Sequence, residues 1–315
     1  MRILVTGALG HIGSRLIRDL PSGIPGAELI LVDDLSTQRY CSLFHLPRDG
    51  RYRFIETDIL QADLRALLKG VDSVIHLAAI TDAPSSFENR DRVEEVNFAG
   101  TERVARACAE AGCALFFVST TSVYGTQESV VDEECSEAEL KPQSPYAESK
   151  LKSERMLGEL GRTRGLRFVT CRFGTIFGVS PGMRFHTAIN KFVWQACMGV
   201  PITVWRTALD QKRPYLDLGD AVGAIRFVLE RNLFDRATYN MVTVNTSVAA
   251  IVEIIRSEIP DAEVRFVDSP IMNQLSYEVA TRKSESAGIA YRGDLRRSIL
   301  ETIETIRSAR SLLAE

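Results

Sequence analysis

The sequence predicts an α/β protein in which a doubly wound parallel sheet is followed by a smaller C-terminal α/β substrate lobe. Short apolar runs alternate with helical patterns through the first half of the 315-residue chain. This alternation indicates right-handed crossovers between parallel strands that helices cover on both faces. A glycine-rich turn, GALGHIG at residues 7–13, follows the first apolar run and precedes the first helical pattern. Such a turn is typical of a dinucleotide-binding domain.

The expected elements follow one another in a regular order. Strands are expected at residues 2–6, 28–33, 51–58, 73–79, 114–120 and 167–173, which gives about six parallel strands. Helical patterns lie at residues 11–20, 63–68, 92–111 and 145–160. From Pro181 the alternation loosens, with helices expected at residues 190–198, 220–230 and from Leu295, and an apolar run at residues 201–205. We therefore place a dinucleotide-binding domain at residues 1–178 and mainly the substrate lobe at residues 179–315, with some segments returning to the first domain.

Composition restricts the class of protein. Hydrophobic residues make up 45% of the chain and its formal net charge is -3, so it can bury a full core but offers no broad basic surface to nucleic acid. No apolar stretch of about 18 residues is present and the N-terminus runs directly into a strand, so we expect a cytoplasmic protein with no membrane partner. The six cysteines form no CxxC pair and the four histidines no HExxH motif. Reduced thiols and no metal site are expected.

Each glycine of the turn has its own predicted role. Gly7 permits the tight turn, Gly10 lets the backbone approach a pyrophosphate at the helix N-terminus, and Gly13 allows the helix to pack on the sheet. Asp33 stands at the end of the second strand, where a carboxylate accepts from a ribose 2′-hydroxyl and repels a 2′-phosphate. This favours NAD over NADP. Asp34 is placed to share the task, and the alternative is that either aspartate only ends the strand.

A second motif, Tyr146-Ala-Glu-Ser-Lys150, places a phenol and an ammonium group four residues apart. On a helix the two side chains share one face, where the ammonium is expected to lower the phenol pKa from its free value of about 10 towards neutrality. A tyrosine with such a pKa both accepts and donates a proton. The pair alone also arises by chance between surface residues, so its weight comes from the glycine-rich turn upstream.

The ordered motifs resemble those of an extended short-chain dehydrogenase/reductase, specifically the NAD-dependent epimerase/dehydratase family that acts on nucleotide sugars. The resemblance covers nearly the whole chain. It rests on GALGHIG, Asp33, Asp58-Ile59, HLAA from His76, Asn97, STTSVYG at 119–125, PYAESK at 145–150 and RFGTIFG at 172–178. It implies a Rossmann fold, bound NAD and a nucleotide-sugar substrate.

The resemblance also implies where the cofactor lies. Asp58 and Ile59 would flank the adenine, and Ala78 and Ala79 would line the pyrophosphate channel. The complete set of expected cofactor contacts is Gly7, Gly10, His11, Ile12, Gly13, Asp33, Asp34, Asp58, Ile59, Leu77, Ala78, Ala79, Asn97 and Lys150.

Three residues form the expected catalytic centre. Oxidation of a sugar alcohol requires a base that takes the hydroxyl proton while hydride leaves for the nicotinamide, and Tyr146 is that base. Lys150 would hold the nicotinamide ribose and keep Tyr146 acidic. By similarity, Thr120 would bond the reacting oxygen; its alternative role is a strand-end hydroxyl that satisfies the backbone.

The two residues after Thr120 distinguish among the reactions of this family. The 4,6-dehydratases carry an Asp-Glu pair there, and the related decarboxylases keep a glutamate at the second position. This chain has Thr121 and Ser122, which cannot replace those carboxylates. Oxidation at carbon 4, rotation of the ketone and reduction from its other face remain, so a nucleotide-sugar 4-epimerase is expected.

Substrate contacts are expected mainly beyond the catalytic helix. Arg213 matches a diphosphate-binding arginine of the family, and guanidinium groups suit diphosphates. Trp205 would pack near the nucleobase or in the core, while Ser86 and Ser122 would touch the sugar. The expected substrate contacts are Ser86, Ser122, Thr175, Arg184, Trp205 and Arg213.

Two departures from the family affect the phosphate contacts. Thr175 replaces an asparagine that binds phosphate in many relatives, and a second diphosphate arginine is replaced near Leu275. Arg184 and His186 lie in the substrate-facing segment and are candidates to compensate. These departures keep a second function open, namely an NAD-dependent dehydrogenase or reductase of a sugar, sugar acid or cyclitol.

A third alternative is a noncatalytic dinucleotide sensor, which the intact catalytic residues disfavour. The resemblance implies a homodimer that associates through the long helices following Arg92 and Pro145. The apolar stripes of those helices are equally explained by packing on the sheet.

Overall fold

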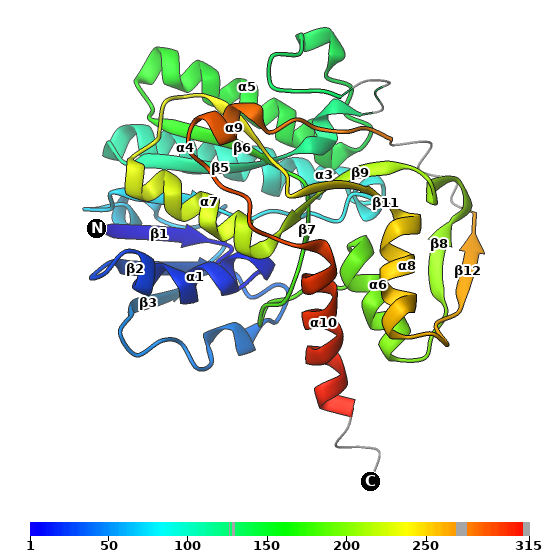
Figure 1. Ribbon diagram of the computed structural model, residues 1–315. Coiled ribbons are helices and arrows are strands. Elements are labelled where there is room, and N and C mark those ends of the chain that lie inside the picture. The colour runs from blue at the N-terminus through cyan, green and yellow to red at the C-terminus, as the bar shows by residue number, and fades with distance from the viewer. Residues whose placement is uncertain (126, 128–129, 269–275, 311–315) are drawn as a thin grey trace.

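A seven-stranded parallel sheet forms the centre of the computed structural model, which describes residues 1–125, 127, 130–268 and 276–310. Its strand order is β10-β6-β5-β4-β1-β2-β3 (Figure 1). The strands are β1 (Arg2–Thr6), β2 (Glu28–Asp33), β3 (Arg51–Glu56), β4 (Ser73–His76), β5 (Ala114–Thr120), β6 (Phe168–Phe173) and β10 (Thr238–Met241). The order reverses at β1, which confirms the predicted doubly wound α/β fold.

Helices cover both faces of this sheet. Helices α1 (His11–Gly23) and α7 (Leu218–Arg231) lie on one face, and α4 (Gly100–Ala111) and α5 (Pro145–Arg164) lie on the other (Figure 1). Side chains of β1 alternate between these layers, with Ile3 packed on the α1 side and Leu4 on the α4 side. Because both faces are buried, the strands read as continuous apolar runs rather than as alternating ones.

One predicted helix is interrupted. The sequence predicts a single helix over residues 92–111, but the chain forms α3 (Arg90–Val93), a π-helical turn η3 (Glu94–Ala99) and then α4. The wider turn brings Asn97 against the backbone of Ile80, where its amide donates to the carbonyl oxygen at 2.9 Å and accepts from the N–H at 2.8 Å. Such turns are frequent at functional sites, and this one fixes the segment that follows β4.

The seventh strand, β10, differs from the expected six. It pairs in parallel with β6, so that Thr238 lies opposite Thr170. Its four residues are too short to show a strand pattern, and its partner lies far away in the sequence. The chain thus leaves the sheet after β6 and returns to it. The division of the chain at residue 178 stays a prediction.

The remaining elements build the smaller lobe. Strands β7 (Thr175–Phe177), β9 (Lys212–Asp217) and β11 (Val244–Ser247) form a second sheet, while β8 (Ile202–Trp205) pairs with β12 (Val264–Val267). Helices α6 (Ala188–Cys197), α8 (Val248–Glu258) and α10 (Leu295–Arg310) share one apolar core through side chains such as Ile189, Ile251 and Ile299 (Figure 1). The short helices α2 (Leu64–Leu67) and α9 (Arg282–Ser286) complete the set of described α-helices.

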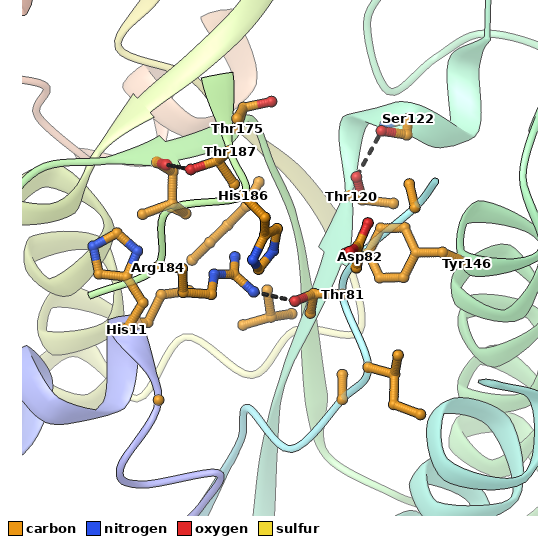
Figure 2. A pocket seen from close by; sticks show the side chains of 18 of the residues that line it. His11, Thr81, Asp82, Thr120, Ser122, Tyr146, Thr175, Arg184, His186 and Thr187 are labelled. Carbon is orange, nitrogen blue, oxygen red and sulfur yellow. Dashed lines mark hydrogen bonds between the residues drawn. The ribbon is translucent and has the colours of Figure 1, made fainter. Parts of the chain in front are cut away.

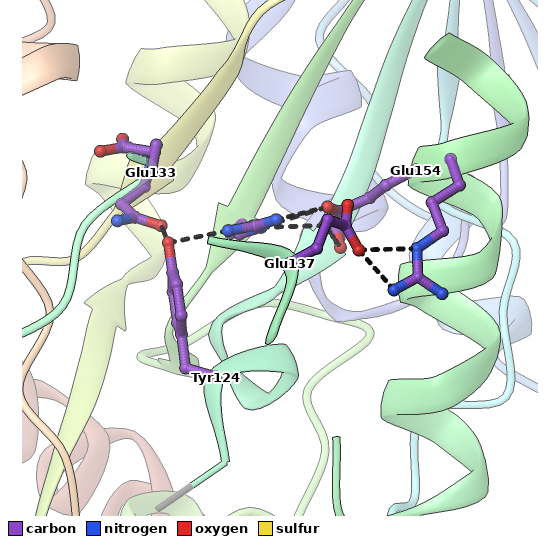
Figure 3. Close-up of polar contacts among 8 residues, drawn as sticks. Tyr124, Glu133, Glu137 and Glu154 are labelled. Carbon is purple, nitrogen blue, oxygen red and sulfur yellow. Dashed lines mark hydrogen bonds and ion pairs between the residues drawn. The ribbon is translucent and has the colours of Figure 1, made fainter. Parts of the chain in front are cut away.

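A buried ion pair joins the catalytic helix to the sheet. Arg172 of β6 and Glu154 of α5 have side chains only 6% and 8% exposed, and Arg172 Nη2 lies 2.7 Å from Glu154 Oε2. Arg172 Nη1 donates to the Tyr124 hydroxyl at 2.9 Å, and that hydroxyl donates to Asn240 of β10 at 2.9 Å. Ser119 of β5 also donates to Glu154. Figure 3 shows this network from Tyr124 to Glu154.

We expect Glu154→Gln to lower the free energy of unfolding by about 3 kcal/mol, because it leaves the Arg172 charge buried without a carboxylate. Urea denaturation followed by circular dichroism measures the effect. The exposed pair of Arg155 and Glu137, with side chains 57% and 69% exposed, provides the matched control (Figure 3). Glu137→Gln should change stability by no more than about 1 kcal/mol. Equal losses in the two variants would contradict the structural role of the buried pair.

Candidate functional site

A cavity of about 730 Å³ opens at the carboxyl ends of the parallel strands, between the sheet and the smaller lobe. In open α/β sheets, ligands bind at this edge, where the strand order reverses. Its wall includes the glycine-rich turn after β1, the ends of β2, β4 and β5, the start of α5, and residues of β7, α6, β8 and β9. The cavity therefore joins most of the predicted site residues.

The glycine-rich turn has the geometry that its spacing predicts. Gly7 has φ +64°, and a Cβ atom there would lie 2.6 Å from the backbone nitrogen of Ala78. A Cβ atom on Gly13 would lie 2.6 Å from the carbonyl oxygens of Gly7 and Ala8. Gly10 precedes the first turn of α1, which contains no acidic residue. The first N–H groups of a helix have no intrahelical acceptor, so this end of α1, whose residues line the cavity, offers a favourable field for an anion.

His11 begins α1 and is 2% exposed. Its Nε2 atom lies 2.8 Å from the carbonyl oxygen of Gly178, whereas Nδ1 is buried without a partner among the described residues. Burial, assisted by the charge of Arg184, lowers the pKa of His11 to about 3. The imidazole is therefore neutral at physiological pH. Ile12 follows it in the cavity wall.

Asp33, the last residue of β2, and Asp34, which follows it, differ in their surroundings. The half-buried Asp33 accepts hydrogen bonds from the N–H groups of Leu9 and Leu35, both at 3.0 Å, and burial raises its pKa above the usual value. Asp34 is exposed and accepts from the N–H of Ser36 at 3.0 Å. Both line the cavity. Asp33 thus ties the second strand to the glycine-rich turn.

Most of the other predicted cofactor residues line the same cavity. Asp58, Ile59, Leu77, Ala78 and Ala79 are all in its wall. Asp58 accepts from the N–H of Leu60 at 2.9 Å, and Ile59 is 5% exposed. These residues form a continuous surface from the end of β3 to the end of β4.

Two predicted contacts lie behind the cavity wall. Asn97 is fully buried and holds the backbone of Ile80, which itself lines the cavity. Ser86 is also fully buried; its hydroxyl donates to the carbonyl oxygen of Ala83 at 2.6 Å and accepts from the N–H of Tyr146 at 3.4 Å. Both side chains already have backbone partners. Their place in the structure is to support the wall rather than to contact a ligand.

Tyr146 and Lys150 both reach the cavity from the first turns of α5. Ser144 caps this helix by accepting from the N–H of Ala147 at 3.2 Å, and Pro145 occupies its first turn. Lys150 is 3% exposed, and its ammonium donates to the carbonyl oxygen of Val118 at 2.8 Å. Burial lowers the pKa of Lys150 to about 8, against the opposing influence of Glu154. The buried ammonium thus interacts with the end of β5.

The expected lowering of the Tyr146 pKa by Lys150 is wrong for the protein alone. Burial raises the pKa of Tyr146 above its usual value. The influences that oppose burial are the charge of Arg184 and a hydrogen bond with Thr120; Lys150 is not among them. The spacing of Tyr146 and Lys150 sets their common face, but it did not show that the ammonium is directed to Val118.

Thr120 and Ser122 face the reacting end of the cavity. Thr120 is 7% exposed, and its hydroxyl accepts from the N–H of Ser122 at 3.1 Å (Figure 2). Thr121 points away into the core, where its hydroxyl lies 3.4 Å from that of Tyr277. Thr120 therefore satisfies a backbone N–H at the strand end, as one interpretation of the sequence predicts. It also lies near Tyr146, as the other interpretation requires.

The smaller lobe supplies the opposite wall. Thr175, Arg184, Trp205 and Arg213 all line the cavity. His186 also lines it, and desolvation together with the charge of Arg184 lowers its pKa to about 4. Figure 2 shows Thr175, Arg184 and His186 across the cavity from Thr120 and Tyr146. Leu275 lies outside the described residues.

The wall also contains residues that the sequence did not indicate, among them four polar ones. Thr81 and Asp82 follow the HLAA segment and lie near Arg184, while Arg39 and Tyr277 come from distant loops. Extending the HLAA motif by three residues would have found Thr81 and Asp82. No local pattern marks Arg39 or Tyr277, because only the fold brings them to the cavity.

The described residues contain no cluster of three or more histidine, cysteine, aspartate or glutamate side chains placed to hold a metal ion. None of the described helices has both the length and the apolar character that crossing a bilayer requires.

Comparison with known proteins identifies the family. The model of the "NAD dependent epimerase/dehydratase family" matches residues 3–241, which is more than half of the chain. The chain belongs to this family. This confirms the resemblance seen in the motifs and NAD as the cofactor of the family. The NAD-dependent epimerase/dehydratase family includes enzymes of more than one reaction type.

Three members of this family are similar to the chain. The uncharacterized UDP-glucose epimerase YtcB of Bacillus subtilis is 34% identical over 237 residues, which are 73% of this chain and 72% of that protein. A trifunctional UDP-glucose 4,6-dehydratase, 3,5-epimerase and reductase of Arabidopsis thaliana is 28% identical over 96% of this chain, which spans only 46% of that protein. The structure of MoeE5 in complex with UDP-glucuronic acid and NAD is 28% identical, with a TM-score of 0.85 over 98% of this chain and 100% of that chain.

We expect Asp33→Asn to reduce the preference for NAD over NADP about tenfold or more. The substitution removes the charge that repels a 2′-phosphate but keeps an acceptor for a backbone N–H. Titration with NADH and NADPH, followed by nicotinamide fluorescence, measures the ratio of dissociation constants. Asp34→Asn is the matched control and should change the ratio much less. An unchanged preference in Asp33→Asn would refute the role given to its carboxylate.

We expect Tyr146 in the cofactor-free protein to ionise only above pH 10, the value for a free tyrosine being about 10, because burial raises its pKa. Subtracting the ultraviolet absorbance titration of Tyr146→Phe from that of the unmodified protein isolates the signal of this phenol. Ionisation of Tyr146 near neutral pH would contradict the structure and restore the expectation drawn from the sequence.

Proposed function

We propose that this protein is an NAD-dependent nucleotide-sugar epimerase that inverts the configuration at carbon 4. One observation carries the proposal. Thr120, Tyr146 and Lys150 line the same cavity as the glycine-rich turn, whereas Thr121 and Ser122 supply no carboxylate for elimination of water. This arrangement provides proton transfer beside a dinucleotide site and lacks the acid–base pair that dehydration requires.

NAD fits the residues of the cavity. The glycine-rich turn and the first N–H groups of α1 would hold the pyrophosphate, Asp33 the adenosine ribose, and Asp58 with Ile59 the adenine. Lys150 would hold the nicotinamide ribose. When bound, NAD supplies a reversible hydride acceptor for the carbon of a sugar alcohol.

Tyr146 would accept the proton that the reaction releases and later return it. In the NAD-bound protein, where the positive charge of the nicotinamide would favour the deprotonated phenol, Tyr146 would take the proton of the C4 hydroxyl as the alcohol is oxidised to a ketone. After rotation of the ketone, Tyr146 would give the proton back to the oxygen as carbon 4 is reduced from its other face. Hydride, proton and oxidation state therefore balance over one turnover, and no cofactor is consumed. Thr120 would bond the oxygen throughout.

The carboxylates of the cavity support epimerisation over dehydration. Among the described residues its wall holds Asp33, Asp34, Asp58 and Asp82. The first three lie at the ends of β2 and β3, at the adenosine end in this proposal. Asp82 accepts from the N–H of Ser85 at 3.3 Å and stands alone on the substrate side. Elimination of water needs both an acid and a base beside the sugar, and a single aspartate does not provide that pair.

The substrate is proposed to be a UDP-sugar. YtcB is described as a UDP-glucose epimerase, and MoeE5 has been solved with UDP-glucuronic acid. In this chain Arg213 would bind the diphosphate by paired hydrogen bonds, and Trp205 would pack near the nucleobase. A homodimer through the helices after Arg92 and Pro145 also stays a proposal.

Nuclear magnetic resonance of the purified protein with UDP-glucose or UDP-glucuronic acid tests the reaction. We expect the C4 epimer to form without added NAD, with no loss of water and no accumulation of NADH. Net NADH production would instead indicate a dehydrogenase. A product lighter by one water molecule would indicate a dehydratase and contradict the proposal.

We expect Tyr146→Phe to lower kcat by about 100-fold or more, because it removes the proton-transferring hydroxyl. Its NAD content should stay near that of the unmodified protein, since the ring is kept. Turnover in the epimerisation assay and cofactor released by denaturation measure the two quantities. Tyr40→Phe, at a side chain that is 51% exposed and outside the cavity wall, is the matched control. Full activity in Tyr146→Phe would refute the mechanism.

A further inference from the structure

A buried chain of hydrogen bonds joins the first turn of α1 to the segment that follows β7. The Ser180 hydroxyl donates to the carbonyl oxygen of His11 at 2.9 Å. The Ser180 oxygen accepts from the Ser14 hydroxyl at 3.1 Å, and the Ser14 oxygen accepts from the N–H of Gly182 at 2.9 Å. Ser14 is fully buried and Ser180 is 8% exposed. The chain is continuous because each of the two hydroxyls both donates and accepts.

His11 makes a second connection between the same two segments. A carbonyl oxygen only accepts, so the contact of 2.8 Å between His11 Nε2 and the carbonyl oxygen of Gly178 places the imidazole hydrogen on Nε2. The two backbones also approach closely, since a Cβ atom on Gly182 would lie 2.3 Å from the carbonyl oxygen of Leu9. The segment after β7 is therefore fixed directly against the glycine-rich turn.

This segment continues into the loop that faces the substrate side of the cavity. Arg184 and His186 line the cavity from this loop (Figure 2). Asn190 of α6 is fully buried, and its amide donates to the carbonyl oxygen of Arg184 at 3.0 Å while its amide oxygen accepts from the N–H of Gly178 at 3.3 Å. The loop is thus held at two places, by the first turn of α1 and by α6.

The two serines act on the loop from outside the cavity. Ser14 and Ser180 are absent from the described residues that line the cavity, so their hydroxyls are not ligand contacts. Without the Ser14 oxygen, the N–H of Gly182 would be buried without its acceptor, which favours departure of the loop from this conformation. A ligand that then binds has to order the loop at the expense of its own affinity.

We propose that Ser14 and Ser180 are positioning residues for the sugar nucleotide, through which the cofactor-binding helix α1 holds the substrate-facing loop. This inference rests on the proposed function of the site. The hydrogen-bonded chain places the loop, with Arg184 and His186, before the sugar nucleotide binds. The affinity for the sugar nucleotide therefore depends on two residues that do not touch it.

Calorimetric titration of the purified NAD-loaded protein with UDP-glucose tests this proposal without turnover. We expect Ser14→Ala and Ser180→Ala each to weaken the binding of UDP-glucose about tenfold. NAD content should stay near that of the unmodified protein, because the glycine-rich turn and the first N–H groups of α1 are kept. The double variant should bind about as weakly as either single variant, since both substitutions break the same chain.

Hydrogen exchange followed by mass spectrometry gives a second measurement that does not need the substrate. Amide exchange should become faster at residues 178–187 in both serine variants and stay unchanged in the central sheet. Ser22→Ala is the matched control, because Ser22 lies in the same helix but is exposed and donates to the carbonyl oxygen of Asp19. It should leave both the affinity for UDP-glucose and the exchange of the loop unchanged.

Three outcomes separate this proposal from its alternatives. Unchanged affinity for UDP-glucose in both serine variants overturns it. An equal loss of NAD and UDP-glucose, with faster exchange throughout the protein, also overturns it, because the serines would then only stabilise the fold. If the unmodified protein binds no UDP-glucose, the proposed substrate is rejected and the exchange alone decides: faster exchange confined to residues 178–187 upholds the control of the loop by the serines, and unchanged exchange refutes it.

Discussion

The buried pair of Arg172 and Glu154 is the interaction on which the arrangement of the site depends. It places a charged residue in β6, a strand buried along its whole length. The partner comes from α5, two turns beyond Tyr146 and one beyond Lys150. A charge in such surroundings is tolerated only with a well-placed counter-charge, so the rotation and height of α5 on the sheet are fixed together. The Ser119 hydroxyl donates a hydrogen bond to the same carboxylate, so the end of β5, beside Thr120, is held by the same interaction.

Charge is distributed unevenly along the cavity. Asp33, Asp34 and Asp58 lie at the ends of β2 and β3 together with Arg39 and Arg92, while Lys150 and Arg184 lie farther along and the imidazole of His11 between these regions is neutral. A dinucleotide has the complementary pattern, with ribose hydroxyls near one end and phosphates towards its centre. Hydroxyls donate to carboxylates, and phosphates require cations or free N–H groups.

The sequence predicted the elements whose signals are local. Continuous apolar runs identified the first six strands, and the glycine-rich turn was found with its φ and close contacts correctly anticipated at Gly7 and Gly13. β10 was missed because it has only four residues, too few to show a strand pattern. Its pairing with β6 also depends on the chain returning to the sheet from a distant part of the sequence. Ser86 and Asn97 were placed near the site, but which way each side chain points depends on packing. The pKa of Tyr146 was misjudged for the same reason, since desolvation has no signature in residue spacing.

Because the chain leaves the central sheet and returns to it, the substrate lobe cannot be replaced by that of another protein without also affecting a strand of the sheet. β10 comes after β7, α6, β8, β9 and α7 in the sequence, yet it completes the sheet and contributes Asn240 to the network around Tyr124 and Arg172. A hybrid that joins the first six strands of this chain to the substrate lobe of another protein would therefore import a foreign strand beside β6. A single junction after β6 would therefore replace part of the sheet together with the substrate-binding residues. A successful chimaera needs one junction before the exchanged segment and a second one that returns to this chain for β10.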